Sequence, residues 1–303
     1  MPGKTVIVLV NWNSFEYTHQ CLLSLEKCNN TAAFDIVVVD NGSVDSSAAD
    51  LKQEHPAIIL IQAGSNLGFA GGNNLGMQYA MEHSYKYVML LNNDTFVEPD
   101  FIDVLVAYMD ENPETGVIQP KIYCNNNRSL IWNGGSYFNK LLGLAYTKGY
   151  LSKDKPGNSR IKEVDWVTGC GFFTRTEILR KTGVLEEKFF IYYEDVDLSF
   201  RIKNAGYRLI YHPESVIYHI AGMSNKSKSK QKEGYVNPVV HYLSHRNRIW
   251  LVKRYATWPF MVPTVLYHSS YSLAVMIYFV LRRRFKKLNA LLSGIRDGLA
   301  GSL

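Results

Sequence analysis

Carboxylates that follow apolar segments are the first candidates for chemistry in this sequence. Asp94 comes after the apolar run YVMLL at 87–91 and two amides, Asn92 and Asn93. A carboxylate in this place suits a hard divalent cation, which also takes phosphate oxygens and water as ligands. The alternative is a turn carboxylate that caps the next helix. His219, after the strand-like residues 216–218, is a candidate nitrogen ligand for the same cation, although a lone histidine is more often structural.

A second acidic group lies at 194–197, where Glu194-Asp195-Val196-Asp197 follows an aromatic run and is predicted to begin a helix. The helix dipole favours carboxylates in a first turn, so these residues have a structural explanation. A carboxylate beside an aromatic wall is also suited to take a proton from a hydroxyl group. The residues alone leave both interpretations of Asp195 open.

The elements that must position these groups alternate along the first hundred residues. Strands are predicted at 5–11, 35–41, 57–63 and 87–93, and helices at 15–28, 44–54 and 70–83. Nearly all-apolar strands that alternate with helices are typical of a parallel sheet covered on both faces. Ser43 is the predicted N-cap of the second helix, and Pro99 is the predicted first residue of a helix after the fourth strand.

Polar residues follow all four predicted strands, where ligands bind in open parallel sheets. They are Asn11-Trp12-Asn13, Asp40-Asn41-Gly42-Ser43, Gly64-Ser65-Asn66 and Asn92-Asn93-Asp94. These amide and carboxylate groups predict a site for a ligand with many hydroxyls and nucleobase-type hydrogen bonds. Asp40 is suited to accept hydrogen bonds from a ribose or a pyrimidine. An Asx turn or a helix cap is the alternative role for Asp40.

A glycine-rich segment, NLGFAGGNNLG at 66–76, precedes the third predicted helix. Glycines allow the backbone to approach a ligand closely, and free N–H groups can bind it. The first strand is not followed by GxGxxG, which argues against a Rossmann dehydrogenase. A nucleotidyltransferase would typically have a basic, glycine-rich loop at that place, and this sequence has Asn11-Trp12-Asn13-Ser14.

Shorter, aromatic-rich segments with Gly and Asn turns follow residue 115, and they predict a mixed sheet with an irregular insertion. Strands are predicted at 164–169, 207–211 and 215–220, and helices at 175–182 and 196–205. A polar, basic stretch from Ser224 to Lys232 is predicted to be a mobile loop. From Asn237 onward the pattern is helical.

Composition is that of an ordinary globular chain of 303 residues, 47% hydrophobic and 20% charged. The four cysteines, Cys21, Cys28, Cys124 and Cys170, have no CxxC spacing, so we expect reduced, buried thiols. The first apolar stretch has only six residues and continues into the first strand. We therefore expect no secretory signal peptide and a cytoplasmic location.

Basic residues of the last third account for the net charge of +6, with one cluster of lysines at 226–232 and another of Lys and Arg at 282–287. They predict an anionic partner, either a membrane surface or a phosphorylated ligand, or else a solvated basic face. The 27 residues between Arg254 and Arg282 contain no Asp, Glu, Lys or Arg. Pro, His and Ser residues interrupt this run, which argues against a membrane span. We expect membrane-surface contact through 254–287, with a helix packed on the domain as the alternative.

Motifs along nearly the whole chain resemble the family 2 inverting glycosyltransferases, in particular their rhamnosyltransferase-like branch. The matching segments are VIVLVNWNS at 6–14, VVVDNGSVD at 37–45, NLGFAGGNNLG at 66–76, LLNNDT at 90–95, VTGCGFFTRTEIL at 167–179, FFIYYEDVDLSFRIKNAGY at 189–207, HIAGMS at 219–224 and HRNR at 245–248.

The resemblance implies an α/β GT-A fold with a mainly parallel, mixed central sheet and a C-terminal helical extension. The catalytic domain would span 1–223, with a nucleotide-sugar half at 1–115 and an acceptor half at 116–223. A mobile basic loop would follow at 224–236, and a helical region at 237–303. Rhamnose from dTDP-rhamnose is the expected donor group, with another donor such as a UDP-hexose as the alternative. A non-catalytic module that binds nucleotide sugars or glycans is the less favoured alternative.

The same resemblance implies roles for individual residues. Asp94 and His219 would bind Mg²⁺ or Mn²⁺, and Asp195 would act as the general base. The DxD-type motif of the family reads Asn92-Asn93-Asp94 here, so the metal would have fewer protein carboxylates. Donor-binding residues would be Asn11, Asn13, Asp40, Gly42, Asn66, Gly68, Gly72, Asn73, Asn92, Asn93, Arg246 and Arg248, of which the two arginines have a helix-surface role as the alternative. Acceptor-binding residues would be Trp166, Gly169, Cys170, Gly171, Tyr193 and Glu194.

The acceptor implied is a saccharide or a lipid-linked saccharide of a cell-surface polysaccharide. The enzyme would then work in the cytoplasm, at the inner face of the plasma membrane. No nucleic-acid partner is expected.

Overall fold

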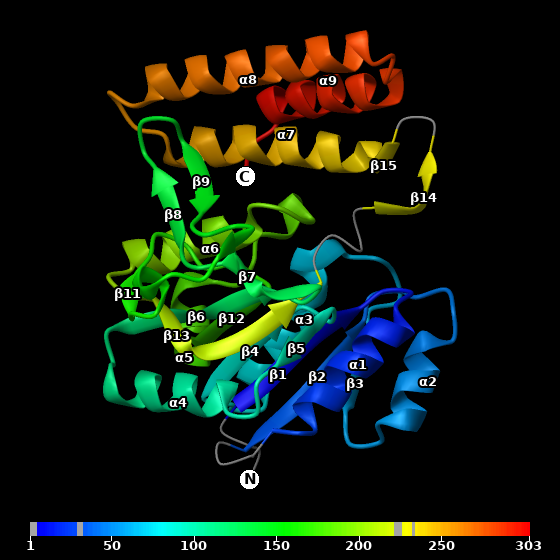
Figure 1. Cartoon of the computed structure of the whole chain (residues 1–303), viewed down its shortest axis with the longest axis vertical. Helices are drawn as coiled ribbons and strands as arrows, with labels where there is room; N and C mark the ends of the chain where they lie inside the picture. Colours follow the sequence, from blue (N-terminus) through cyan, green and yellow to red (C-terminus); the bar gives the residue numbers. More distant parts are fainter. Residues whose placement is uncertain (1–4, 29–32, 221–225, 232–233) are drawn as a thin grey trace. The chain divides into compact units, whose positions relative to one another are not determined.

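The computed structural model describes residues 5–28, 33–220, 226–231 and 234–303 (Figure 1). The chain divides into two compact units. The first contains residues 1–137, 147–187 and 194–221, and the second contains residues 138–146, 188–193 and 222–303. Each unit has its own packing and is described separately below.

A mixed sheet forms the centre of the first unit. Four parallel strands lie in the order β4 (Tyr87–Leu91), β1 (Thr5–Asn11), β2 (Phe34–Asp40) and β3 (Ile59–Gln62). Next to β4 lies the antiparallel strand β12 (Gly171–Arg175), followed by β6 (Thr115–Cys124). The long strand β13 (Arg208–His219) pairs in parallel with β6. The structure therefore confirms the predicted α/β fold with a mainly parallel central sheet.

Smaller strands complete this part of the fold. They are β5 (Thr95–Val97), β7 (Asn127–Asn133), β10 (Ser152–Lys153) and β11 (Lys162–Glu163). A separate two-stranded sheet, β8 (Ser136–Asn139) with β9 (Leu144–Thr147), contains residues 138–146 of the second unit. Two 3₁₀ turns are η1 (Pro156–Asn158) and η2 (Glu187–Phe189).

Helices cover both faces of the parallel strands. They are α1 (Phe15–Leu25), α2 (Ser47–Glu54), α3 (Gly68–Glu82), α4 (Phe101–Glu111), α5 (Thr176–Thr182) and α6 (Glu194–Asn204). Alternate residues of β1 belong to two separate cores: Ile7 packs with residues of α1 and α4, and Val8 packs with residues of α3 and α5. Because side chains of a strand alternate between faces, both faces must be apolar, which explains the nearly continuous apolar runs in the sequence.

Some predicted boundaries are wrong, and the contacts show why. Residues 164–169 do not form a strand: the Val167 N–H donates to Ser199 Oγ (3.0 Å), and only a single bridge joins Trp166 to Ser136. The strand predicted there is β12, a few residues later. The helix predicted from Ser43 begins at Ser47, because Ser43 Oγ instead accepts a hydrogen bond from the Asn13 N–H (2.9 Å).

Two further boundaries differ around prolines. The helix predicted to start at Pro99 begins at Phe101. The strands predicted at 207–211 and 215–220 are one strand, β13, whose register shifts between His212 and Val216. Pro213 lies in this shift, where a residue without an N–H removes no ladder hydrogen bond.

Three helices dominate the second unit: α7 (Pro238–Tyr255), α8 (Met261–Leu281) and α9 (Phe285–Ala300) (Figure 1). Helices α7 and α9 pack tightly, since a Cβ atom on Gly294 would lie 2.4 Å from the Tyr242 carbonyl oxygen. The C-terminal helical region predicted from Asn237 is therefore confirmed. Part of the predicted loop at 224–236 forms β14 (Lys226–Gln231) and β15 (Gly234–Val236), while 221–225 and 232–233 lie outside the described residues.

Helix α8 is apolar and largely exposed. Among the described residues it is the helix whose length and composition would allow it to cross a membrane: it has 21 residues, a mean hydropathy of 1.4, and 11% of that stretch is buried. The four cysteines are all free and buried, as predicted.

Candidate active site

Asp94 and His219 meet at the carboxyl end of the central sheet. Asp94 lies in the turn between β4 and β5, and His219 is the last residue of β13. The two strands β5 and β13 pair with His219 opposite Thr95, which brings these distant parts of the chain together. His219 Nε2 lies 3.0 Å from Asp94 Oδ1, and both residues are buried. The two metal ligands implied by the resemblance are therefore neighbours.

The surroundings of His219 hold its ring in place. The indole of Trp132 packs edge-on against the imidazole with ring centres 4.6 Å apart, and Asn92 Nδ2 lies 3.1 Å from Nε2. Burial disfavours the charged ring, but the Cys170 thiol and the Asp94 carboxylate outweigh it and raise the pKa of His219 to about 10. The ring thus carries a proton beside Asp94, and a cation bound at this place would displace that proton.

The pair fits a divalent cation. An oxygen and a nitrogen 3.0 Å apart can both lie at a ligand distance of about 2.1 Å from one ion. Within the described residues no group of three or more His, Cys, Asp and Glu side chains could hold a metal. Asp94 and His219 would supply two ligands to such an ion, and its other positions would belong to water or to oxygens of a bound ligand.

Asp195 lies in the first turn of α6, held by backbone N–H groups. Its Oδ2 accepts a hydrogen bond from the Gly169 N–H (3.0 Å), and its Oδ1 accepts one from the Val196 N–H (2.8 Å). Burial raises the pKa of Asp195, while these hydrogen bonds favour the charged form and oppose the rise. Gly169 also packs against an aromatic ring, because an added Cβ would lie 2.7 Å from Phe69 Cε1.

Glu194 is the other buried carboxyl of this turn. Burial and the neighbouring Asp195 raise the pKa of Glu194 well above its usual range. Its Oε2 has no hydrogen-bond partner among the described residues. Two adjacent buried carboxyls cannot both ionise easily, and the N–H groups favour the charged form of Asp195, so the proton is held more strongly by Glu194 than by Asp195.

The segment Gly169–Gly171 connects the two acidic positions. Gly169 donates to Asp195, while Cys170 lies next to His219 and close enough to Asp94 and Asp195 for both carboxylates to raise the pKa of its thiol, which burial already raises. Gly171 then enters β12 opposite Leu91 of β4. Asp195 and the Asp94–His219 pair are therefore grouped around one short segment at the same end of the sheet.

Asn11 and Asp40 form a polar network at the ends of β1 and β2, where they are opposite one another. Asn11 Nδ2 lies within hydrogen-bond distance of Asp40 Oδ1 (3.2 Å) and Ser47 Oγ (2.9 Å). Asp40 Oδ2 accepts from the Ser43 N–H (3.2 Å). Asn13 has a positive φ of 50°, and its side-chain oxygen accepts from the Val44 N–H (2.8 Å).

Gly42 stands where the backbone of this network meets the turn before α3. Its φ is +73°, and an added Cβ would lie 2.5 Å from the carbonyl carbon of Ser65. Both facts require glycine, because side chains rarely adopt this φ and the backbone cannot move aside.

The glycine-rich segment is held by Asn41, a strand-end residue to which sequence reasoning gave no role of its own. Asn41 Nδ2 donates to the Gly68 carbonyl (2.9 Å) and to Asn66 Oδ1 (3.3 Å). Further along, Gly72 packs against β1, since a Cβ there would lie 2.9 Å from Val10 Cγ1. The Asn73 amide donates to the Phe69 carbonyl (2.9 Å). Close packing of α3 on the sheet thus accounts for part of this motif.

Other candidates have contacts of their own. The amide of Asn93 donates to Thr18 Oγ1 (2.8 Å). Trp166 is buried, and its Nε1 donates to the Tyr137 carbonyl (3.0 Å).

Three candidates lie in the second unit: Tyr193, Arg246 and Arg248. Arg246 donates to the carbonyls of Lys188 (2.8 Å) and Phe189 (3.1 Å), and Arg248 Nε donates to the Tyr193 hydroxyl (3.1 Å).

A buried amide, Asn247, is a residue that sequence reasoning missed. Its Nδ2 lies 2.9 Å from three carbonyls, of Phe189, Ile191 and Tyr192. Tyr192 and Tyr193 have positive φ values of 76° and 75°. These side-chain contacts hold a strained segment that leads directly into Glu194 and Asp195.

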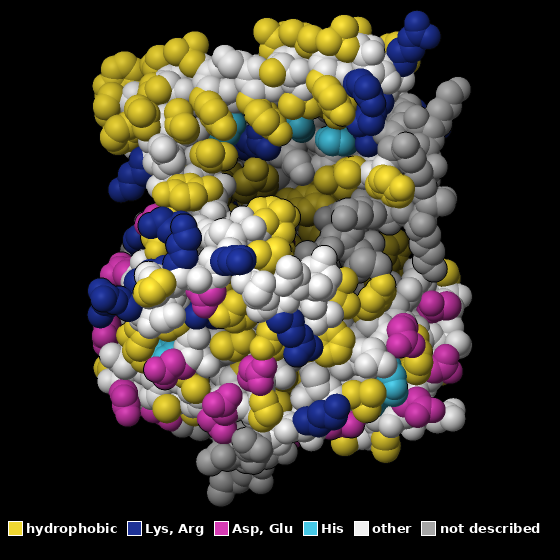
Figure 2. All heavy atoms as spheres, in the orientation of Figure 1, with side chains coloured by type: hydrophobic (Ala, Val, Ile, Leu, Met, Phe, Trp, Pro, Cys, Tyr) yellow, Lys and Arg dark blue, Asp and Glu magenta, His cyan; other side chains and the backbone are white. Residues whose placement is uncertain are grey.

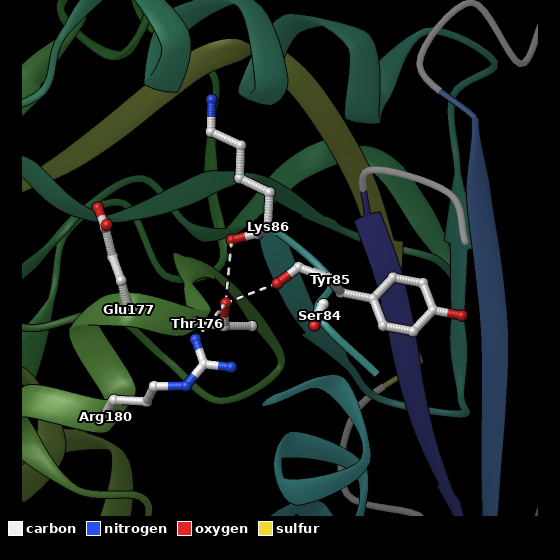
Figure 3. A pocket seen from close by; sticks show the side chains of 6 residues that line it. All are labelled: Ser84, Tyr85, Lys86, Thr176, Glu177 and Arg180. Carbon is white, nitrogen blue, oxygen red and sulfur yellow. Dashed lines mark hydrogen bonds between the residues drawn. The ribbon is translucent and has the colours of Figure 1, made fainter. Parts of the chain in front are cut away.

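A shallow cavity of about 260 Å³ lies elsewhere, at the amino end of β4 (Figure 3). It is lined by Ser84, Tyr85, Lys86, Thr176, Glu177 and Arg180. The Thr176 hydroxyl donates to the Tyr85 carbonyl (2.6 Å), so the polar groups drawn there join β4 to α5. The cavity is at the opposite edge of the sheet from Asp94.

Comparison with known proteins links this chain to one family. The sequence model described as "Glycosyltransferase like family 2" matches residues 2–236. The N-acetylglucosaminyl-diphospho-decaprenol L-rhamnosyltransferase of Mycobacterium tuberculosis (strain ATCC 25618 / H37Rv) is 24% identical over 282 residues, which are 85% of this chain and 87% of that protein. Rhamnosyltransferase WbbL of Escherichia coli (strain K12) is 25% identical over 256 residues, 79% of this chain and 92% of that protein.

Solved structures agree on the fold. TarS 1–349 of S. aureus in complex with UDP-GlcNAc has a TM-score of 0.61 at 17% identity, and covers 98% of this chain and 81% of that one. Mannosyltransferase PcManGT from Pyrobaculum calidifontis, in complex with GDP-Man and Mn²⁺, has a TM-score of 0.57 at 15% identity, and covers 100% of this chain and 77% of that one.

Proposed function

Because this chain belongs to glycosyltransferase family 2, we propose that it transfers rhamnose from dTDP-rhamnose to a saccharide or lipid-linked saccharide in cell-surface polysaccharide synthesis. The observation that carries this proposal is the grouping of Asp195 and the Asp94–His219 pair around the segment 169–171. Two relatives with rhamnosyltransferase names support the donor sugar. UDP-hexoses are the alternative donors, since one structural neighbour holds UDP-GlcNAc.

Asp94 and His219 would hold a Mg²⁺ or Mn²⁺ ion, which would offset the negative charge on the departing nucleoside diphosphate. The burial of both side chains supports this role, because a buried carboxylate and a buried imidazole 3.0 Å apart keep their mutual geometry before any ligand arrives. Trp132, packed edge-on against the ring, would fix the orientation of His219.

Asp195 would take the proton from the attacking hydroxyl of the acceptor. The N–H groups of Gly169 and Val196 orient its carboxylate, and a neutral Glu194 beside it leaves the charge on Asp195. Attack by the acceptor from the face opposite the diphosphate would invert the anomeric configuration. Asp195 thus supplies the proton acceptor for one direct displacement.

The donor would bind along the carboxyl ends of the parallel strands. Asp40, held by Asn11 and by the Ser43 N–H, would accept hydrogen bonds from the nucleoside. The remaining donor residues proposed in the first unit are Asn13, Gly42, Asn66, Gly68, Gly72, Asn73, Asn92 and Asn93. Arg246 remains a predicted contact of the diphosphate, whereas Arg248, which the resemblance also placed there, is assigned a different ligand below.

Acceptor residues would come from the segments around Asp195. We propose Trp166, Gly169, Cys170, Gly171, Tyr193 and Glu194. The apolar, exposed helix α8 and the basic residues around it would hold the enzyme against the inner face of the plasma membrane.

A panel of nucleotide sugars tests the donor. Thermal unfolding is measured with Mg²⁺ and the same concentration of dTDP-rhamnose, UDP-GlcNAc or GDP-mannose. A ligand at about 100 times its Kd stabilises the folded state by about 2.7 kcal/mol, and we expect the largest shift with dTDP-rhamnose. The same shift in Asp94→Asn would contradict a metal-assisted donor site, and a larger shift with UDP-GlcNAc would replace the proposed donor.

A further inference from the structure

Arg248 in α7 is a partly buried cation that stacks and hydrogen-bonds with tyrosines. Its Nε donates to the Tyr193 hydroxyl (3.1 Å), and its guanidinium stacks on the ring of Tyr271 in α8, 4.6 Å from the ring centre. Within the described part of the chain no Asp or Glu pairs with it. A guanidinium has five N–H donors and stays charged. Tyr193 takes one and Tyr271 another, so three donors remain for another ligand.

Two histidines beside Arg248 have unused nitrogen atoms. His245 Nδ1 lies 2.8 Å from the His241 carbonyl, and His268 Nε2 lies 3.1 Å from the Gly143 carbonyl. The other ring nitrogen of each is buried with no partner among the described residues. Burial lowers the pKa of both rings and Arg248 lowers it further, so both rings are neutral as they stand. A bound anion would relieve this repulsion and allow each free nitrogen to carry a proton toward it.

The sequence around Arg248 contains almost no acidic residue that could pair with it. Residues 234–303 include ten Lys and Arg but a single acidic residue, Asp297. The carboxylate of Asp297 is bonded to Tyr242 (3.0 Å) and Arg296 (2.8 Å). An anion for Arg248 must therefore come from outside this region.

The helix that supplies Tyr271 and His268 has an apolar surface as well. Large apolar side chains on α8 are half or more exposed, at Leu266, Leu273, Ile277 and Leu281. Their spacing places them along one side of the helix. Figure 2 shows this band of apolar side chains in the second unit, with His, Lys and Arg side chains beneath it. One helix thus borders both a cationic cluster and an apolar surface.

We propose that α7 and α8 form a binding site for a lipid phosphate, in which Arg248, His245 and His268 bind the phosphate and the exposed apolar side chains of α8 contact the hydrocarbon chain. The site matches a long-chain phosphate or diphosphate ester in both its charge and its apolar part. It rests on the proposed function, because it assigns these residues to the lipid carrier of the acceptor. A nucleoside diphosphate has no hydrocarbon chain and would leave the α8 surface uncovered.

Binding of farnesyl diphosphate to the full chain tests the proposal without any sugar transfer. Kd is measured by calorimetry in EDTA, so that a metal-held diphosphate does not contribute. Farnesol, which has the hydrocarbon chain alone, probes the apolar contact with α8. Inorganic pyrophosphate, which has the diphosphate alone, probes the contact with Arg248 and the two histidines. We expect both to bind at least about tenfold more weakly than farnesyl diphosphate. Equal binding of pyrophosphate and farnesyl diphosphate would overturn the hydrocarbon contact.

Arg248→Gln should weaken farnesyl diphosphate about tenfold or more, since it removes charge-assisted hydrogen bonds. Arg282→Gln is the matched control, because Arg282 is an exposed cation at the end of α8, and its Kd should stay within about twofold of wild type. An equal loss of farnesyl diphosphate affinity in both variants would mean that any positive charge on the helices has this effect, and it would overturn the site. His245→Gln gives a second variant should Arg248→Gln fail to fold, and unchanged binding there would also count against the site.

A parallel titration with dTDP and Mg²⁺ distinguishes the two sources of phosphate. We expect Arg248→Gln to leave this Kd unchanged. If Arg248→Gln weakens dTDP and not farnesyl diphosphate, Arg248 belongs to the donor and the lipid site is wrong. Failure of farnesyl diphosphate to bind while dTDP-rhamnose still stabilises the protein would reject this inference and leave the proposed glycosyl transfer intact.

Discussion

The two units of the chain treat charge in opposite ways. In the first unit the buried charged groups at the sheet edge have internal partners: Asp94 faces His219, and Asp195 accepts two backbone N–H groups. In the second unit the cations greatly outnumber the acids, and Arg248 has no carboxylate partner among the described residues. In the first unit the charged groups are positioned before a ligand binds. In the second unit the excess positive charge requires an anion from outside the unit.

Removal of the metal should have the largest effect on the proposed site of the first unit. Two protein ligands alone hold an ion weakly, so EDTA should abolish transfer and Mg²⁺ or Mn²⁺ should restore it. Initial rates with dTDP-rhamnose and an acceptor saccharide measure this. Full activity in chelator would remove the role proposed for Asp94 and His219.

Neutralising exposed cations tests whether the excess positive charge of the second unit binds an anionic partner. Replacing Arg282, Arg283 and Lys286 by Gln should weaken binding to vesicles with anionic lipids by about 1 kcal/mol for each charge, or about a hundredfold together. Co-sedimentation measures the bound fraction. The control replaces Lys153, Lys155 and Arg160, exposed cations of the first unit, and should change binding little. Equal losses in the two triple variants would show that the units do not differ in this respect.

Backbone geometry gives a smaller test of the preformed donor site. Gly42→Ala should lower both stability and donor affinity, because Gly42 has a positive φ and its Cβ would meet the Ser65 backbone at 2.5 Å. Gly64→Ala has a similar φ of +75° but meets nothing within 4 Å, so it should cost only the strain of about 1–2 kcal/mol. Urea unfolding and the Kd of dTDP separate the two. Similar values for both variants would mean that the close approach at Gly42 has no importance.

The smallest effect concerns the proton on Glu194. Its pKa is raised in the folded state, so the stability that its proton contributes is present at low pH and is lost as pH rises above the usual range of Glu. The loss is about 1.4 kcal/mol for each pH unit that separates the folded pKa from the unfolded one. Glu194→Gln cannot ionise and should therefore lose less stability than wild type between about pH 5 and pH 8. Urea midpoints across this range measure it, and parallel pH profiles would contradict a protonated Glu194.

The sequence was sufficient for the sheet and for the acidic positions, but not for the contacts that support them. Apolar strands followed by Asp40 and Asp94 indicate where these carboxylates lie, because strand ends meet at one edge of a parallel sheet. Trp132 and Asn247 were not predicted, since nothing near them in the sequence shows which ring or carbonyls they will contact. The strand expected at 164–169 was wrong for a similar reason: its N–H at Val167 binds Ser199, a distant side chain.

Asp195 is the residue on which the whole comparison depends, because a preformed site without a base could bind a nucleotide sugar but not transfer it. The most direct measurement is single-turnover transfer by Asp195→Asn, with dTDP-rhamnose binding and thermal unfolding followed in the same preparation. We predict that the variant folds and binds the donor as wild type does, while transfer falls by about 10²–10⁴-fold. A folded Asp195→Asn variant that transfers sugar at nearly the wild-type rate would contradict the assignment of Asp195 as the base.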